Sequence, residues 1–451
     1  MARGKKKETL TSEERLQAAL IPESEQPYKV PGNWCWTRLG AITEIIGGGT
    51  PSSNIPEYYN DGTIPWISPA DLSGYTDVYI SKGAKNITTL GLEKSSAKML
   101  PTNTVCLSSR APIGYVVIAG NPLCTNQGFK SFLPASCYLA RYLCWYLKGN
   151  KELLESYASG TTFLELSASK AGLVEFPLAP LAEQQRIVDR IESLFSKLDG
   201  AKQKARDALD SFETRKAAIL HKAFTGELTA QWRKEHSVGM ESWEHLTYSE
   251  LGISKLGKML DKAKNKGDMV PYLRNVNVRW FSFDMSDVSL MQATEEEIKL
   301  LSVKNGDLFI CEGGEPGRCA IWKEPDARLI FQKALHRFRP NEKVISEFLC
   351  YNLYFMSING TLAKYFTGTT IKHLTGQALS RIPVLTPSVY EQTEIVRILD
   401  NLLAKEQQAK EAAQGVLEQI DLIKKAILAR AFRGKLGTND PNEESATSLL
   451  C

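Results

Sequence analysis

The sequence lacks the long apolar runs and the paired metal ligands that mark membrane and metal-binding proteins. No apolar stretch among its 451 residues approaches the roughly 20 that a membrane-spanning helix requires. The first eight residues, Met-Ala-Arg-Gly-Lys-Lys-Lys-Glu, are followed by no apolar core, so we expect no secretory signal and a cytoplasmic protein. The five histidines show no metal-ligand spacing. We therefore expect no membrane partner and no metal on this chain.

The nine cysteines include no Cys-x-x-Cys pair, and Cys311 and Cys319 are too far apart for a zinc knuckle. An odd number of cysteines in a cytoplasmic chain is typical of free thiols that pack as small apolar groups. We interpret them as structural.

Motifs for catalysis are missing as well. An enzyme that methylates adenine amino groups needs an Asp/Asn-Pro-Pro-aromatic loop to hold the flipped base. The nearest match, Asn121-Pro122-Leu123, lacks the second proline and the aromatic residue. A translocase needs Gly-x-x-x-x-Gly-Lys-Ser/Thr around the phosphates, and the glycines between Gly120 and Lys130 have the wrong spacing. We expect no catalytic residue and no cofactor on this chain.

The charge balance is nearly even, with a formal net charge of +4. Hydrophobic content of 43% and charged content of 24% are ordinary for a globular protein of two or three domains. If the chain binds nucleic acid, its basic residues must be concentrated locally, or partner subunits must supply further phosphate contacts.

The strongest positive feature is an internal repeat, because residues 157–228 match residues 365–436 at an offset of 208 positions. The two copies share Tyr-x-x-Gly-Thr-Thr, then Glu-Gln-x-x-Ile-Val, and finally Ala-Ile-Leu-x-x-Ala-Phe-x-Gly-x-Leu. A chain that duplicates one unit can present two similar surfaces related by a pseudo-twofold axis. Duplex DNA offers a matching pair of half-sites.

Apolar residues recur in the second half of each copy at alternating steps of four and three, from Ile187 to Ala223 and from Ile395 to Ile427. This heptad pattern, which Glu406 breaks once, predicts two helices of about 40 residues, or roughly 60 Å. Such helices need a partner for their apolar stripes, and we expect them to pack on each other in antiparallel fashion. Two alternatives are separate packing on globular domains and dimerisation with another chain.

Two globular blocks, 34–179 and 241–386, contain short β-branched runs between Gly and Pro, which is typical of short strands and long loops. Trp66 and Tyr272 are expected to be core aromatics rather than platforms for stacking bases. The positions that the blocks share are Pro65-Trp66-Ile67 with Pro271-Tyr272-Leu273, Pro112 with Pro316, Gln127 with Gln332, and Pro134 with Pro340. We interpret them as one fold with two different surfaces.

These features together resemble the specificity subunit of type I restriction–modification systems. The resemblance rests on both Glu-Gln-x-x-Ile-Val helix starts, on the helix exits Lys222–Leu228 and Arg430–Leu436, on Leu228–Arg233, and on Trp34–Gly40. It covers nearly the whole chain from Trp34 to Leu436. The Lys-rich segment before Trp34 departs from the pattern, since not every member of the family has it.

The resemblance implies an α+β protein in which two similar α/β target-recognition domains are separated by a long antiparallel two-helix coiled coil. Each domain would read one half of a bipartite asymmetric DNA sequence. The chain itself would be non-catalytic. The helices would act as a spacer and dock two methyltransferase subunits, and two motor–nuclease subunits would join for restriction. S-adenosylmethionine, ATP and Mg would then be used by those partners.

The domain boundaries follow from these assignments. The sequence predicts an N-terminal arm (1–33), whose short helix starts at a Thr11–Glu14 capping box, followed by the first recognition domain (34–179), a helix (180–228), a linker (229–240), the second recognition domain (241–386), a second helix (387–436) and a disordered tail (437–451).

DNA contact calls for Arg, Lys, Asn, Gln or hydroxyl side chains on loops that reach a groove or a phosphate. The candidates are Arg110, Gln127, Lys130, Thr161, Thr162, Lys264, Lys266, Arg274, Arg318, Lys333, Arg337, Thr369 and Thr370. Each has a structural alternative: Arg110 and Arg318 as surface or ion-paired residues, the Gly-Thr-Thr segments as capping turns, and the lysines around 255–266 as a solvated face. At the level of the whole chain, the alternatives are a coiled-coil adaptor that does not read DNA and a self-sufficient nuclease or methylase.

Overall fold

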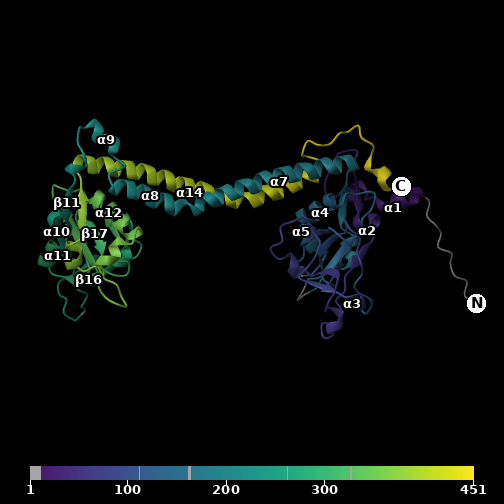
Figure 1. Ribbon diagram of the computed structural model, residues 1–451, viewed down its shortest axis with the longest axis horizontal. Helices are drawn as coiled ribbons and strands as arrows, with labels where there is room; N and C mark the ends of the chain where they lie inside the picture. Colours follow the sequence, from purple (N-terminus) through teal and green to yellow (C-terminus); the bar gives the residue numbers. More distant parts are fainter. Residues whose placement is uncertain (1–11, 111, 161–163, 262, 326–327, 451) are drawn as a thin grey trace, which may run out of the picture. The chain divides into compact units, whose positions relative to one another are not determined.

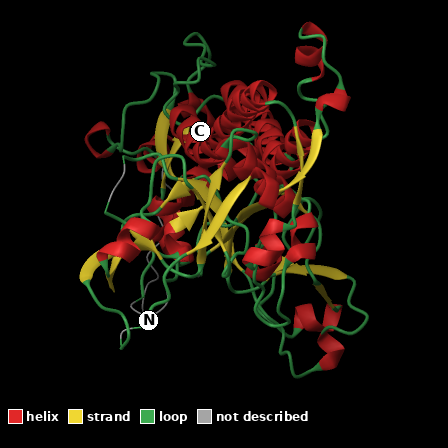
Figure 2. Cartoon of the chain, turned by 90° about the vertical axis from the view of Figure 1, so that its left-hand side faces the viewer, coloured by secondary structure: helices red, strands yellow, loops and turns green. Residues whose placement is uncertain are grey.

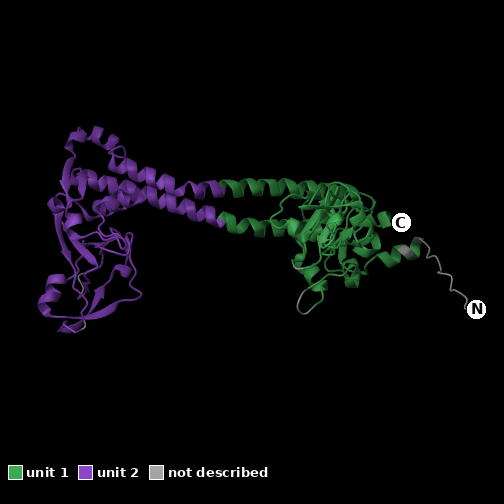
Figure 3. Cartoon of the chain, turned by 60° about the horizontal axis from the view of Figure 1, so that its bottom comes forward, with its two compact units in different colours: residues 1–204, 416–451 green, residues 205–415 purple. Residues whose placement is uncertain are grey.

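The computed structural model describes residues 12–110, 112–160, 164–261, 263–325 and 328–450. The chain divides into two compact units, which Figure 3 colours separately. Unit 1 comprises Met1–Lys204 and Val416–Cys451, and unit 2 comprises Ala205–Gly415. Short strands joined by long loops make up most of each globular part, as the sequence predicts (Figure 2).

Unit 1 is built on a five-stranded sheet with the order β2-β9-β6-β7-β4, a three-stranded sheet β5-β3-β8 and a strand pair β1-β10. All residues of β6 and β7 are buried, because helix α4 covers one face of these strands and a second apolar cluster, which includes Cys106 and Val117, covers the other. The bounds are β1 Cys35–Arg38, β2 Ile45–Gly47, β3 Ile64–Ile67, β4 Tyr79–Ile80, β5 Lys85–Ile87, β6 Val105–Ser108, β7 Val116–Ala119, β8 Cys124–Thr125, β9 Phe129–Phe132, α4 Ala140–Gly149 and β10 Glu175–Leu178.

Unit 2 repeats this plan with the sheets β12-β20-β17-β18 and β16-β13-β19 and the pair β11-β21. It has no counterpart of β4 among its described residues, and it adds the hairpin β14-β15. The bounds are β11 Glu244–Thr247, β12 Gly252–Leu256, β13 Asp268–Leu273, β14 Val278–Arg279, β15 Ser282–Phe283, β16 Ser289–Ala293, α11 Glu295–Leu301, β17 Leu308–Cys311, β18 Cys319–Ile321, β19 Ile330–Phe331, β20 Leu335–Pro340, α12 Ser346–Ile358 and β21 Pro383–Thr386.

Strand register shows which positions of the two units are equivalent. Trp66 pairs with Cys124 in β8, and Tyr272 pairs with Ile330 in β19; both aromatic side chains are buried, as predicted for core residues. The predicted match of Gln127 with Gln332 is wrong by one residue. The amide of Asn126 donates to the carbonyl of Ile67, and the amide of Gln332 donates to that of Leu273. The structural counterpart of Gln127 is therefore Lys333.

Both heptad segments are helical, but the first is interrupted where an unbroken helix was predicted. The helices are α7 Leu181–Asp210, α8 Phe212–Phe224 and α14 Val389–Ala431 (Figure 1). At the break, the hydroxyl of Ser211 donates to the carbonyls of Asp207 and Ala208. Hydroxyl bonds of this kind bend helices. The second copy has Gln419 at this position and continues without a break.

The expected antiparallel pairing of these helices is present within each unit. In unit 1, Lys202 of α7 lies 3.7 Å from Asp421 of α14, and Asp199 lies 2.6 Å from Lys424. Residue numbers thus rise along one helix as they fall along the other. Unit 2 shows the same direction between α8 and α14, because Phe212 faces Lys410 and Arg215 lies 2.8 Å from Glu406. Glu406, which breaks the heptad, is therefore the partner of Arg215.

The apolar seam is less continuous than the heptad predicts. Val416 and Ile423 of α14 are exposed, whereas Ile420 and Leu428 are buried. Between Asp199 and Lys202, which pair with α14, the chain has Gly200 and Ala201, which offer at most one methyl group to cover apolar surface.

The tail was predicted to be disordered, and this prediction is wrong. Residues 438–446 fold back onto the rest of unit 1. Both terminal guanidinium nitrogens of Arg186 donate to the carboxylate of Glu443 at 2.7 Å, and the hydroxyl of Thr438 donates to Glu183 at 2.7 Å. The indole of Trp34 donates to Asn439 at 3.0 Å. The start of the N-terminal arm, including Thr11, lies outside the described residues, and its helix α1 spans Ser12–Ala19.

The linker of unit 2, together with Trp243 just after it, makes a comparable set of contacts. Thr229, Arg233 and the indole of Trp243 all donate to the buried carboxylate of Glu391, at 2.6 to 2.9 Å. Glu391 is the repeat partner of Glu183, so the tail does in unit 1 what the linker does in unit 2. Arg233 belongs to the short helix α9 (Ala230–Glu235). The repeated sequence motif ends at Leu436 and therefore does not reveal this shared role.

Ending the chain at Gly437 is expected to lower the free energy of unfolding of unit 1 by about 1–2 kcal/mol, because Glu183 and Arg186 lose hydrogen-bond partners. Hydrogen exchange at the amides of 183–191 should accelerate. The equivalent amides of 391–399 in unit 2 are the internal control and should not change. Unaltered exchange at 183–191 would show that the tail contributes nothing to stability.

Candidate nucleic-acid interface

Three polar loops of unit 1 meet where β6 ends and β9 begins. These strands are antiparallel, with Ser108 opposite Phe129, so the segment after β6 and the turn before β9 share one edge of the sheet. The amide of Ser109 donates to the carbonyl of Gly128 at 2.7 Å, and Arg110 forms a bridge with Glu165. We name the described residues of 109–114, 126–128 and 158–166 the polar edge of unit 1.

Unit 2 has an equivalent polar edge, formed by residues 312–318, 332–334 and 366–374. Cys311 at the end of β17 lies opposite Leu335 at the start of β20. The amide of Glu312 donates to the carbonyl of Ala334 at 2.9 Å, and the amide of Leu374 donates to that of Glu312 at 2.7 Å. Among the described residues, the structure thus brings the segments around the Gly-Thr-Thr motif next to segments that differ between the units.

A fourth loop lies beside each polar edge. In unit 1 the loop 48–63 leads from β2 to β3, and the hydroxyl of Thr50 donates to Gln127. In unit 2 the loop 257–267 leads from β12 to β13, and the amide of Lys333 donates to the carbonyl of Lys258 at 2.8 Å. Gln127 and Lys333, which are structural counterparts, therefore join the fourth loop to the polar edge in both units.

The predicted contacts of unit 1 divide into accessible and inaccessible side chains. Arg110 is 47% exposed and lies 3.1 Å from Glu165, and Gln127 is exposed. Lys130 is buried, where its ammonium donates to Ser109 at 3.2 Å and lies 3.7 Å from Glu165. Burial lowers the pKa of Lys130, which the nearby Glu165 opposes. The buried side chain of Lys130 supports the edge instead of projecting from it.

Two further candidates in unit 1, Thr161 and Thr162, lie outside the described residues. Their repeat partners in unit 2, Thr369 and Thr370, are exposed on the hairpin closed by the pairing of Thr367 with His373.

The other candidates of unit 2 divide into exposed lysines and arginines that are held by hydrogen bonds. Lys264, Lys266 and Lys333 are exposed. Arg274 donates to Asp287 at 2.7 Å, and Arg318 donates to Glu315 and to the carbonyl of Asn275. These contacts leave both guanidinium groups mostly covered, and Arg318 braces the edge through Glu315.

Arg337 is placed differently from the sequence prediction. Its side chain is buried and donates to the carbonyl of Ser302 at 2.7 Å. Because successive residues of a strand point to opposite faces, Arg337 on β20 points away from His336. His336 is also buried, which lowers its pKa, and it contacts the carbonyl of Leu374. Arg337 therefore has no free guanidinium to offer DNA.

The pair Glu165 and His373 was missed by the sequence reasoning. These residues are repeat partners, since they occupy the same position after Gly-Thr-Thr. Glu165 holds Arg110, whereas His373 lies beside Gly313, where a Cβ would come within 3.1 Å of its Nδ1 atom. A position that differs inside an otherwise shared motif is the signal that could have revealed them.

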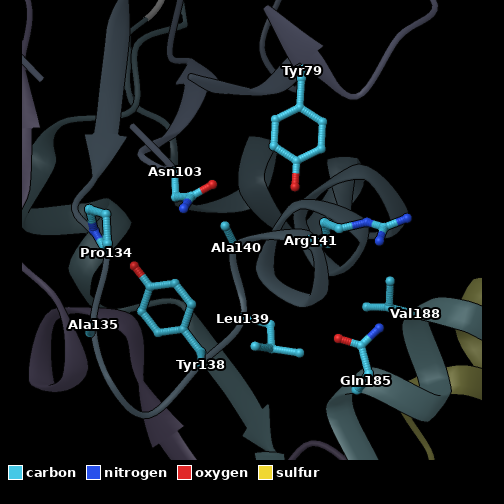
Figure 4. A pocket seen from close by; sticks show the side chains of 10 residues that line it. All are labelled: Tyr79, Asn103, Pro134, Ala135, Tyr138, Leu139, Ala140, Arg141, Gln185 and Val188. Atoms are coloured by element: carbon cyan, nitrogen blue, oxygen red, sulfur yellow. The ribbon is translucent and has the colours of Figure 1, made fainter. Parts of the chain in front are cut away.

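The opposite end of the unit 1 sheet carries an open pocket of about 310 Å³ (Figure 4). Asn103, which precedes β6, lines it together with Tyr138 and Gln185. Arg141 also lines it and donates to Glu192 at 2.9 Å.

Within the described ranges, no group of three His, Cys, Asp or Glu residues could hold a metal ion. No described helix has both the length and the apolar character needed to cross a membrane.

Comparison with known proteins gives consistent results. The MjaIX specificity subunit of a type I restriction enzyme from Methanocaldococcus jannaschii is 41% identical over 184 residues, which are 40% of this chain and 42% of that protein. The EcoKI specificity subunit of Escherichia coli K12 is 24% identical over 94% of this chain and 95% of its own length. The crystal structure of the HsdS subunit from Thermoanaerobacter tengcongensis aligns with a TM-score of 0.67 at 18% identity, over 92% of this chain and 100% of that one.

A family model also matches both halves of the chain. Residues 31–208 and 240–418 each match the model described as the type I restriction modification DNA specificity domain. The two matches together span well over half of the sequence, and each includes one strand scaffold and most of the helix that follows it. The resemblance seen in the repeated motifs is thereby confirmed: the chain belongs to the family of type I restriction–modification DNA specificity subunits.

Proposed function

We propose that this chain reads a bipartite, asymmetric DNA sequence, with the polar edge of each unit contacting one half. The observation that carries the proposal is that the two units repeat one scaffold while their edges differ in chemistry. Arg110 stands where unit 2 has Gly313, and Gln127 stands where unit 2 has Lys333. Two different edges on one scaffold suit two different half-sites, because base identity is read by side chains in the grooves.

The proposal assigns the chemistry to partner subunits. The helix pair would serve as a spacer and dock two methyltransferase subunits, and two motor–nuclease subunits would complete a restriction complex. S-adenosylmethionine, ATP and Mg would be used on those partners. The chain would be a non-catalytic subunit that acts in the cytoplasm.

Binding to mapped target DNA tests this function. Sequencing methylated adenines in the host genome would give the target, and a gel shift would compare a target duplex with a scrambled one. The purified full chain would be assayed with and without the methyltransferase subunit. We expect preference for the target duplex in the assembled complex. Equal binding to both duplexes would favour the rival function of a coiled-coil adaptor that does not read DNA.

Replacing Lys264 and Lys266 together with glutamine is expected to weaken binding to all duplexes. If each lysine contacts one phosphate, the slope of log K against log salt should fall by about 2. The matched control is the Lys405→Gln/Lys425→Gln pair, which removes the same charge from exposed positions of α14. An equal loss of slope in both double variants would mean that the effect comes from net charge alone.

A further inference from the structure

The fourth loop of unit 2 exposes two adjacent large apolar side chains. Met259 is 57% exposed and Leu260 is 48% exposed, in the first half of the loop 257–267 that lies beside the polar edge. Single apolar residues at a surface are common. Here the apolar pair is flanked by the exposed Lys264, which is 85% accessible, and by Lys266. Lys262 lies outside the described residues.

The loop is braced, so the exposure of Met259 and Leu260 is built into its backbone. At its base, the amide of Lys258 donates to the carbonyl of Phe331 at 2.9 Å. Farther out, the side-chain amide of Asn265 donates to the carbonyl of Met259 at 3.2 Å. The carboxylate of Asp261 accepts from the amides of Ala263 and Lys264.

Carboxylates near the base of the loop already have cationic partners. Glu297 pairs with Lys258, and Arg328 pairs with both Asp268 and Glu295. Asp261, within the loop, lies 3.6 Å from the ammonium of Lys264 and is otherwise engaged with backbone amides. The surface that Met259 and Leu260 present is thus apolar at its centre and basic at its margin. It complements DNA, which carries charged phosphates on its outside and apolar base faces in its interior.

We propose that Met259 and Leu260 form a wedge that enters the DNA and unstacks a base step in the half-site read by unit 2, while Lys264 and Lys266 contact the flanking phosphates. This deepens the proposed function and rests on it. Proteins that deform DNA insert Leu, Met and similar side chains between base pairs and recover the unstacking cost through the contacts that the bend permits. Specificity then includes the ease with which that step deforms.

Unit 1 offers an internal contrast. Its equivalent loop, 48–63, contains no lysine or arginine, and none of its large apolar side chains is exposed. The wedge is therefore a property of one unit, and the two half-sites should differ in deformation as well as in sequence.

Base-analogue fluorescence tests the wedge on the full chain assembled with its methyltransferase subunits. The probe is the mapped target duplex, with 2-aminopurine in place of each adenine in turn and pyrrolo-cytosine in place of each cytosine, across and beside both half-sites. We expect an unstacked step in one half-site, apart from the methylated adenines. That signal should be lost in the Met259→Ser/Leu260→Ser variant, while the signal at the methylated adenines remains.

Two further variants make the result specific. Met259→Leu/Leu260→Met keeps an apolar pair and should keep the unstacked step, and Ile55→Ser in the loop of unit 1 should also leave that step in place. The wedge is overturned if target binding occurs with no unstacked step beyond the methylated adenines, or if the serine variant keeps that step. Release of the methyltransferase subunits by the serine variant, with the step retained, would identify the pair as a protein contact. Failure of the wild-type complex to prefer its target would refute the proposed function instead.

Discussion

Replacing Glu391 with alanine should lower the free energy of unfolding of unit 2 by about 3–5 kcal/mol, the cost of breaking a buried ion pair by removing one partner. The side chains of Glu391 and Arg233 are only 1% and 8% exposed, and their nearest atoms are 2.6 Å apart. Thr229 and Trp243 donate to the same carboxylate. Removing it leaves three buried donors without their acceptor, and one of them carries a charge.

Glu394→Ala is the matched control for this prediction. Glu394 lies about one turn further along α14, and its partner Arg397 is 64% exposed. Exposed pairs contribute little, so we expect a much smaller loss than for Glu391→Ala. Denaturant unfolding combined with hydrogen exchange at 389–399 measures both variants. Equal losses in the two variants would show that burial does not determine how much the Glu391 cluster contributes to the free energy of unfolding.

The repeat and the heptads allowed most of the fold to be predicted from the sequence. A heptad specifies helix and apolar stripe directly, and the duplication supplies each stripe with a partner inside the same chain. The break at Ser211 escaped prediction because it depends on hydroxyl bonds to particular carbonyls. The ordered structure of the tail was not predicted, because Thr438, Asn439 and Glu443 contact residues about 250 to 400 positions earlier in the chain. No local sequence pattern reveals contacts over such a separation.

The loops of the candidate site were predictable from the sequence, but the side chains that reach its surface were less so. Arg110 and Lys333 are exposed on their edges, whereas Lys130 and Arg337 are buried. In the sequence all four are basic residues close to a strand end. Which face of a strand a residue occupies depends on register, and a shift of one residue reverses it. The error of one residue in matching Gln127 with Gln332 has the same origin.

Replacing Arg110 with alanine should weaken target binding by about 1–3 kcal/mol, or roughly 5- to 150-fold, and relax the preference at one base position. Arg110 is the exposed arginine of the unit 1 edge, and Glu165 orients its guanidinium at 3.1 Å. A guanidinium can bind the two acceptors of a guanine edge at once. Lysine cannot reproduce that planar geometry, so Arg110→Lys should recover charge without recovering selectivity.

Competition binding against every single-base variant of the mapped target distinguishes base reading from phosphate contact. If Arg110 reads a base, Arg110→Ala flattens the preference at one position in the half-site opposite to the one affected by Met259→Ser/Leu260→Ser. Lys333→Ala, which removes an exposed cation from the edge of unit 2, is the comparison for the other half-site. A uniform loss across all duplexes in the Arg110 variants would assign this residue to the phosphate backbone. The selectivity of unit 1 would then have to come from Gln127 or another side chain of the edge, because Lys130 is buried beneath it.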